Sequence, residues 1–250
     1  MHLLTRFTVI ALAGLAAPVA AFADTIFQDT TFAPGDYSTA FAFSNGSNNT
    51  YAVGQCPSCG NPGQALSLTI NEPQGGGTGT SEFIGLINNT FIYDPATQGA
   101  IGSISASVDK DIFDNAVGTL GNIFRPLIQQ GGNLYVAPIS GPSLVNANPP
   151  GTTGYNTIAA TGLTAADFLE VDTATGVTGT ANPDFAGGPV QFGLAQLLGA
   201  TSVPGTVITF DFDNLNIDLA PAAVPEPGSL PMLLSGLAAI GGFGWTRRTR

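Results

Sequence analysis

Residues 207–219 read V-I-T-F-D-F-D-N-L-N-I-D-L, and this stretch decides the fold class. Apolar and polar residues alternate along it, so that Leu215, Ile217 and Leu219 share one face of an extended chain and the polar residues between them share the other. Alternation with one polar face is typical of half-buried antiparallel strands. Asp213-Asn214 predicts a turn between two such strands.

The same alternation recurs along the chain, whereas helical periodicity is scarce. It predicts further strands at residues 39–43, 66–70, 83–87, 89–93, 104–108, 134–139 and 190–194. Segments rich in Gly, Pro and Asn lie between them, at residues 44–49, 56–63, 72–79, 94–95, 146–154 and 182–189. One short helix is predicted after Thr164, which would cap it. Many short strands with turn-rich connections predict an all-β fold, an antiparallel β-sandwich or jelly roll.

The first 23 residues have the three parts of a secretory signal peptide. Arg6 supplies a positive charge, residues 7–19 form an apolar run, and Ala21 and Ala23 place small side chains where signal peptidase accepts them. We therefore expect a signal-peptide helix at residues 1–23 that signal peptidase removes. The alternative is a membrane anchor, but the run is short for a bilayer that needs about 20 apolar residues.

The end of the chain carries a second candidate targeting signal. A Pro-Glu-Pro motif lies at residues 224–228, an apolar stretch at 230–245 and a basic cluster at 247–250. At 1.5 Å per residue the apolar stretch spans about 24 Å as a helix, less than the roughly 30 Å hydrocarbon core of a bilayer. Arginines favour the cytoplasmic side, so we expect a short transmembrane helix with its carboxyl end inside the cell.

This order of motif, apolar helix and terminal arginines resembles the PEP-CTERM sorting signal. The residues that carry the resemblance are Val224, Pro225, Glu226, Pro227, Arg247, Arg248 and Arg250. The resemblance implies transient arrest in the inner membrane, recognition of the motif by an exosortase, and transfer to the surface or extracellular matrix of a Gram-negative bacterium that makes extracellular polysaccharide. An ordinary single-pass anchor is the alternative.

Between the two signals, residues 24–220 are enough for one domain with its own core. They hold sixteen acids and two bases, Lys110 and Arg125. Such an acidic surface repels phosphate backbones, so we expect no nucleic-acid binding; neutral glycans or divalent cations suit it better. The only histidine is His2, inside the predicted signal peptide. Its position excludes Ser-His-Asp and Cys-His catalysis and His-ligated metals from the mature domain.

The chain has two cysteines, Cys56 and Cys59, in a Cys-Pro-Ser-Cys segment. A structural zinc site needs four ligands, and no further Cys or His is present in the mature segment. A thioredoxin-like site needs a βαβ context, which the surrounding Pro, Gly and Asn residues do not offer. We predict a disulfide, as an oxidising compartment favours; free thiols and redox activity are the alternatives.

Two aspartate clusters are candidate cation sites. Asp109, Asp111 and Asp114 form one, and Asp211 and Asp213 form the other. Alternate residues of a strand share a face, so the two members of each Asp-x-Asp can meet one ion, and calcium prefers several oxygen ligands. The spacing does not fit an EF-hand loop. Calcium is therefore one hypothesis, and solvated turn acids are the other.

Catalytic carboxylates have no clear signature. Glycosidases need a pair of acids at a defined separation, and the glutamates Glu72, Glu82 and Glu170 show no spacing that selects a pair. Five tyrosines of the mature segment are candidates for stacking on sugars, although each also suits a packing role. They are Tyr37, Tyr51, Tyr93, Tyr135 and Tyr155.

Three short stretches of the mature segment resemble concanavalin-A-like or laminin-G-like jelly rolls. They are residues 60–68, 91–104 and 212–217. The resemblance implies a fold that often binds glycans. We therefore predict a non-enzymatic surface or matrix protein that contacts extracellular polysaccharide. A carboxylate-dependent glycosidase or lyase, or a purely structural protein without a ligand, are the alternatives.

Overall fold

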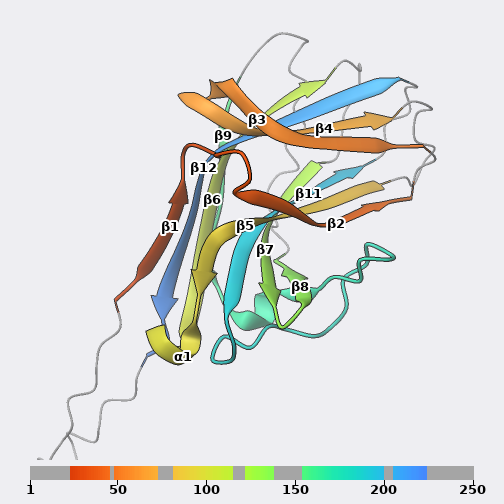
Figure 1. Ribbon diagram of the computed structural model, residues 1–250. Helices are drawn as coiled ribbons and strands as arrows, with labels where there is room; N and C mark the ends of the chain where they lie inside the picture. The colour runs from red at the N-terminus through yellow and green to blue at the C-terminus, as the bar shows by residue number, and fades with distance from the viewer. Residues whose placement is uncertain are drawn as a thin grey trace, which may run out of the picture. The chain divides into compact units, whose positions relative to one another are not determined.

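The computed structural model describes residues 23–45, 48–72, 81–114, 122–137, 154–199 and 205–223. These residues form two six-stranded antiparallel sheets, which are the two layers of a β-sandwich (Figure 1). The all-β antiparallel fold that the alternation predicts is therefore confirmed. The alternation works because side chains point to opposite sides of a strand, so every second residue reaches the interior between the layers.

The strands of each sheet are named here in spatial order. Sheet A contains β3 (Thr50–Gly60), β4 (Gly63–Glu72), β12 (Thr206–Pro221), β6 (Ile101–Asp114) and β9 (Asn156–Leu163), with β1 (Thr25–Asp29) also paired to β12. Sheet B contains β10 (Leu169–Glu170), β8 (Asn133–Val136), β7 (Asn122–Gln130), β11 (Val190–Gly199), β5 (Ser81–Tyr93) and β2 (Tyr37–Ser44). Two short helical segments complete the described elements, α1 (Pro95–Gln98) and the 3-10 turn η1 (Ala165–Asp167).

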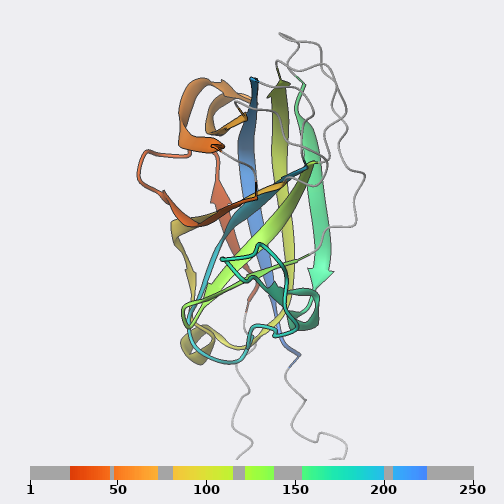
Figure 2. The same ribbon diagram turned by 90° about the vertical axis from the view of Figure 1, so that its right-hand side faces the viewer.

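The main hydrophobic core lies between the two sheets. Phe210 and Phe212 of β12 and Phe192 of β11 are almost fully buried in it. Figure 2 shows β7 and β11 crossing in front of β6 and β12 at an oblique angle, as expected when two twisted sheets pack together. Removing each large aromatic side chain from water stabilises the fold by roughly 1.5–3 kcal/mol.

We expect Phe210→Ala to lower the free energy of unfolding by about 3–5 kcal/mol, because it leaves a cavity among buried neighbours. The matched control is Tyr51→Ala on β3, where the aromatic side chain is 42% exposed; there we expect a change within about 0.5 kcal/mol. Urea unfolding followed by fluorescence or circular dichroism measures both. Equal losses in the two variants would contradict this assignment of the core.

The predicted turn at Asp213-Asn214 is wrong, because β12 runs through it as one strand. The pairing with β6 shifts register between Asp213 and Asn216, and Asn214 has a positive φ of 52°, a conformation that Asn tolerates better than most residues. β12 therefore bends at a bulge. The bend lets its first half pair with β4 and its second half with β1.

Other boundaries also differ from the prediction. The strands expected at 83–87 and 89–93 are one strand, β5, with a register irregularity in its pairing to β11. Residues 56–63, expected as a loop, largely belong to the β3–β4 hairpin. The helix expected after Thr164 is only the 3-10 turn η1, which the Thr164 and Asp167 side chains cap reciprocally. Strands β1, β3, β7 and β9 were not predicted, because Gly, Pro and polar residues blur their alternation. Strand β10 was not predicted either, because it has only two residues and Leu169 was expected in the helix after Thr164.

All described strand pairings and both hydrophobic clusters lie in one compact unit, Phe22–Ala222. A polypeptide of residues 24–222 therefore carries its own complete core. In the part of the chain that the structure describes, no helix is both long enough and apolar enough to cross a bilayer. The predicted signal-peptide helix, apart from Ala23, and the predicted helix at 230–245 lie outside the described residues.

Candidate functional site

The two aspartate clusters of the sequence become one cluster on the outer face of sheet A. In the pairing of β6 with β12, Asp111 lies opposite Asp211 and Asp109 lies opposite Asp213. The intervening residues, such as Phe210 and Phe212, point into the core, so strand alternation places the four aspartates on the other side of the sheet. Sequence reasoning treated the clusters separately because about one hundred residues lie between them.

Donors from β12, from β9 and from the turn between β3 and β4 form hydrogen bonds with two of these carboxylates. The Asn214 side-chain amide donates to Asp109 Oδ2 at 2.8 Å and the Thr157 hydroxyl donates to Asp109 Oδ1 at 2.5 Å. The backbone N–H of Asn214 donates to Asp213 Oδ1 at 2.7 Å, and the backbone N–H of Asn61 donates to Asp213 Oδ2. Each of these two carboxylates therefore has hydrogen-bond partners within the chain for both of its oxygens.

The other two aspartates, Asp111 and Asp211, are buried, as Asp213 is too. Backbone N–H groups of Ile112 and Gly154 donate to the two oxygens of Asp111 at 2.8 and 3.0 Å. Asp211 is 1% exposed and its Oδ1 has no hydrogen-bond partner. Burial raises the pKa of Asp211, and the negative charge of Asp111 raises it further, while a hydrogen bond from Ser67 acts in the opposite direction.

Tyr155 and the disulfide hairpin border the cluster. The Tyr155 hydroxyl donates to the carbonyl of Cys59. Burial raises the pKa of Tyr155, and the negative charges of the four aspartates raise it further. The sulfur atoms of Cys56 and Cys59 are joined as a disulfide whose Cα atoms lie 5.4 Å apart. It lies at the register irregularity between β3 and β4, so it holds the hairpin tip beside the acids.

A calcium ion at Asp109, Asp111, Asp114, Asp211 and Asp213 stays a prediction. Asp114 ends β6 opposite Ile208, away from the register positions of the four cluster aspartates. Among the described residues, no group of three or more His, Cys, Asp or Glu side chains has the geometry to hold a metal ion. The described cluster alone therefore supplies carboxylates without a formed metal site.

We expect Asp211→Asn to raise the free energy of unfolding at pH 7. A raised pKa in the folded state gives stability that is present at low pH and is lost as the pH rises through the folded-state value, and the amide removes that loss. The difference in stability between Asp211→Asn and the parent protein should disappear near pH 3, because side chain 211 is then mostly uncharged in both proteins. Asp109→Asn is the matched control and should destabilise by about 0.5–1.5 kcal/mol, because its carboxylate accepts two side-chain hydrogen bonds. Thermal unfolding at both pH values measures the signs; a loss of stability in Asp211→Asn at pH 7 would overturn this account.

The glutamates are distributed differently. Glu82 is buried on the core side of β5, where Ser44 Oγ donates to its Oε1 at 2.6 Å and Asn49 donates to the same atom. Burial raises the pKa of Glu82, the two hydrogen bonds lower it, and the charge of Glu72 raises it. Glu72 is likewise buried, whereas Glu170 lies half-buried on β10. The structure therefore brings Glu72 and Glu82 into electrostatic contact, inside the sandwich rather than across a surface groove.

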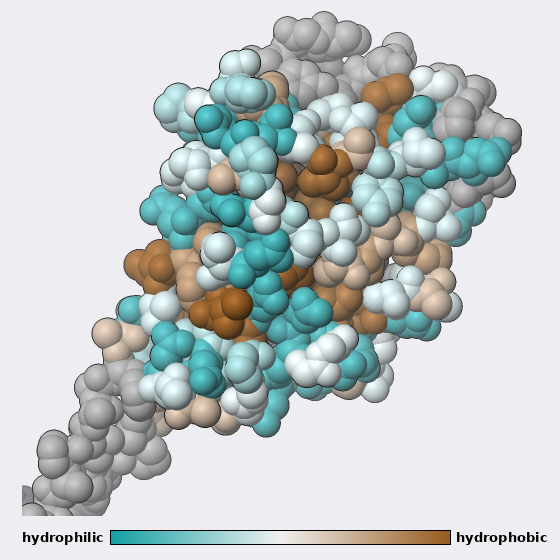
Figure 3. All heavy atoms as spheres, viewed as in Figure 1, coloured by the Kyte–Doolittle hydropathy of each residue, from teal (hydrophilic) through white to brown (hydrophobic). Residues whose placement is uncertain are grey.

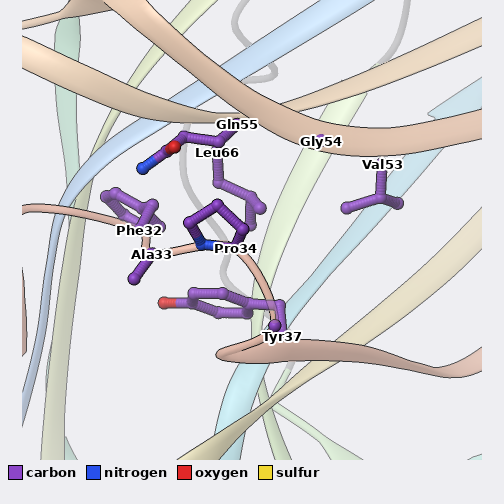
Figure 4. Close-up of a pocket in the computed structure, with 9 residues that line it drawn as sticks. Phe32, Ala33, Pro34, Tyr37, Val53, Gly54, Gln55 and Leu66 are labelled. Atoms are coloured by element: carbon purple, nitrogen blue, oxygen red, sulfur yellow. The ribbon is translucent and has the colours of Figure 1, made fainter.

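A small pocket opens at one end of the sandwich, between the β1–β2 loop and β3 (Figure 4). It encloses about 170 Å³, less than the roughly 300–1,000 Å³ of typical ligand sites. Its walls are Phe32, Ala33, Pro34, Gly35, Tyr37, Val53, Gly54, Gln55 and Leu66. The walls contain no acid, so the pocket is suited to a small apolar group and not to carboxylate catalysis.

The side chain of Asp29 shapes this pocket. Its Oδ1 accepts hydrogen bonds from the backbone N–H groups of Thr31 and Phe32 at 2.9 and 2.8 Å. These bonds hold Phe32 in a positive-φ conformation of 45° with its ring stacked on Tyr37, the ring centroids 5.5 Å apart. Burial raises the pKa of the Tyr37 hydroxyl. Tyr37 therefore acts as a packing residue at the pocket wall.

Exposed aromatic and apolar residues are scattered. Of the five tyrosines, only Tyr51 is well exposed; Tyr93, for example, is buried and donates to the carbonyls of Gln98 and Gly99. The face of the sandwich in Figure 3 shows separate brown apolar spots between teal and white residues. The well-exposed large apolar residues lie on different elements: Ile26, Tyr51, Ile92, Val177 and Val207.

Sheet B carries a second hydrophobic cluster on its outer face, which the sequence analysis missed. Its buried members are Phe41, Phe83, Ile87, Leu127, Leu134, Val136, Val171 and Ala195. Arg125 of β7 lies on the same face, with its guanidinium carbon 5.9 Å from the centroid of the Phe83 ring. The sequence could have pointed to Arg125, because it is the only charged residue between Asp114 and Asp167.

The comparisons with known proteins find the sorting signal. Residues 223–248 match the PEP-CTERM protein-sorting motif, so the resemblance seen in the sequence is confirmed. This motif indicates an exported protein that is processed at the membrane and sorted to the cell surface. Ala21 and the sorting residues Val224, Pro225, Glu226, Pro227, Arg247, Arg248 and Arg250 lie outside the described residues. No curated protein matches the chain.

Solved structures that are similar to the chain include several carbohydrate-binding modules. A family 11 module of a cellulosomal cellulase of Clostridium thermocellum is 13% identical, with a TM-score of 0.41 over 83% of this chain and 99% of that chain. The mannan-recognising module TmCBM27 is 13% identical, with a TM-score of 0.38 over 79% and 99% of the two chains. A xylan-binding domain of Paenibacillus barcinonensis is 12% identical, with a TM-score of 0.29 over 82% and 100%.

Proposed function

We propose that the protein is a non-enzymatic component of the bacterial cell surface or extracellular matrix that contacts extracellular polysaccharide. The observation that carries the proposal is the sorting motif at residues 223–248. Signal peptidase recognises Ala21 and Ala23 and cuts after Ala23, which removes residues 1–23. The helix at 230–245 then arrests the chain in the inner membrane. An exosortase of a Gram-negative host then reads the Pro-Glu-Pro motif and passes the β-sandwich outward.

The described acids support binding better than catalysis. The four cluster aspartates lie side by side on one strand pair, and Asp109, Asp111 and Asp213 accept hydrogen bonds from neighbouring segments of the chain. A glycosidase instead needs two carboxyl groups facing each other across a bound sugar. One observation favours the alternative of a carbohydrate-active enzyme, the buried Glu72–Glu82 contact with its raised Glu82 pKa. Release of new reducing ends from a polysaccharide would support that alternative.

Sorting is tested by replacing Pro225, Glu226 and Pro227 together with alanine in the native host. We expect the variant to remain in the membrane fraction as the longer, unprocessed form, because the exosortase no longer reads the motif. Ser229→Ala, just outside the motif, is the control and should be processed normally. Immunoblots of the membrane fraction and the medium measure both; normal release of the triple variant would refute exosortase sorting.

Binding is tested with purified residues 24–222 on an array of bacterial and plant polysaccharides, in calcium and in chelator. We expect binding to at least one polysaccharide class. Loss of binding in chelator would assign calcium to the aspartate cluster, while unchanged binding would retain the binding function and remove calcium from it. Absence of binding to every glycan would overturn the polysaccharide proposal and leave a structural surface protein.

A further inference from the structure

Among the described residues, Arg125 is a cation without an ion-pair partner on the outer face of sheet B. It is half-buried on β7, and its Nε is buried without a hydrogen-bond partner. Within the described part of the chain the guanidinium forms no ion pair or hydrogen bond, and its contact is the ring of Phe83. Burial lowers the pKa of Arg125, but an arginine stays protonated at neutral pH.

An unmatched guanidinium at this position is unfavourable. Its Nε–H loses water on the buried side without gaining a hydrogen-bond partner among the described residues, which destabilises the folded protein. The rigid fork of an arginine matches a carboxylate through two parallel hydrogen bonds. The protein offers sixteen acids between residues 24 and 220, yet none of the described ones reaches Arg125. The site therefore lacks an anion that its chemistry favours.

The distribution of acids over the two sheets fits an external anion. Strands of sheet A carry Asp29, Glu72, Asp109, Asp111, Asp114, Asp211, Asp213 and Asp218. Strands of sheet B carry only Glu82, which faces the core, and Glu170. The layers of a sandwich lie about 10 Å apart, similar to the Debye length of about 8 Å at physiological salt. The acids on the outer face of sheet A therefore oppose an anion at Arg125 only weakly.

The residues beside Arg125 are apolar and closely packed, and the adjacent row supplies partly exposed apolar side chains. Along one cross-strand row, Arg125 is followed by Ala195 and then Gly85. A side chain at Gly85 would collide with the Phe41 ring, its Cβ lying 2.1 Å from a ring atom. In the adjacent row Ile123, Leu197 and Phe43 are partly exposed on the same face. The C–H face of a sugar ring packs on such apolar side chains.

We infer that Arg125 binds the carboxylate of an acidic, uronate-bearing polysaccharide, with Ile123, Leu197 and Phe43 contacting the apolar face of the sugar. This inference rests on the proposed polysaccharide-binding function and names the class of ligand. It explains why a strongly acidic protein keeps one unpaired base on the sheet that is nearly free of acids.

The test compares polygalacturonate with its fully methyl-esterified form, which has the same backbone without the charge. Residues 24–222 should bind polygalacturonate about tenfold or more tightly than the ester in isothermal titration calorimetry. Arg125→Gln should weaken binding of polygalacturonate about 10- to 100-fold, the effect of one charged hydrogen-bonded contact. Gln28→Glu, on the exposed side of β1, makes the same change in net charge far from the site and should bind like the parent protein.

Arg125→Lys keeps the charge and the apolar stem but loses the fork, so it should bind several-fold more weakly than the parent. This variant decides the question if thermal unfolding shows that Arg125→Gln does not fold. Unchanged polygalacturonate binding in a folded Arg125→Gln or in Arg125→Lys overturns the inference. Binding of neutral glycans with no preference for polygalacturonate overturns the inference but retains the proposed function, whereas no binding to any glycan overturns both.

Discussion

The structure depends on the alternation of side chains along β12. This strand pairs with β6 along one edge and with β4 and then β1 along the other. Phe210 and Phe212 fill the core from one face of β12, while Asp211 and Asp213 lie on the opposite face. A slip of one residue would exchange the two sets and place carboxylates among the aromatic rings. The same register therefore fixes both the hydrophobic core and the acid cluster.

The bulge at Asn214 makes this double pairing possible. A regular strand of this length would keep one neighbour along each edge, but the one extra residue in β12 increases its bend and twist. The bend directs the first half toward the β3–β4 hairpin and the second half toward β1. Asn61 and Asn214 then place their donors against the carboxylates of Asp213 and Asp109. The bulge that bends the sheet therefore also positions hydrogen-bond donors for the carboxylates.

The sequence predicts the fold class well and the site poorly, for physical reasons. Period-two alternation is a local signal, so the strands around Leu68, Ala106 and Phe192 were located from it. Pairing is not local, so the meeting of Asp111 with Asp211 could not be foreseen. The turn expected at Asn214 failed because the residue types that favour a turn also favour a bulge with positive φ.

Unmatched donors and acceptors are more informative about this protein than its total charge. The net charge of the chain is −11, which suggests that the acids dominate its interactions. Most described acids of the cluster, however, already accept hydrogen bonds from their own chain, as Asp109 and Asp111 do. These hydrogen bonds hold the β3–β4 hairpin and the β9 end of sheet A. The Nε of Arg125 has no hydrogen-bond partner among the described residues, because the groups around it are an aromatic ring and apolar residues. A buried group that folding leaves without a partner is the place where an added ligand changes the free energy most. Among the described residues, Asp211 Oδ1 is such a group on the outer face of sheet A and Arg125 Nε is one on the outer face of sheet B, so the first face lacks a donor and the second lacks an acceptor.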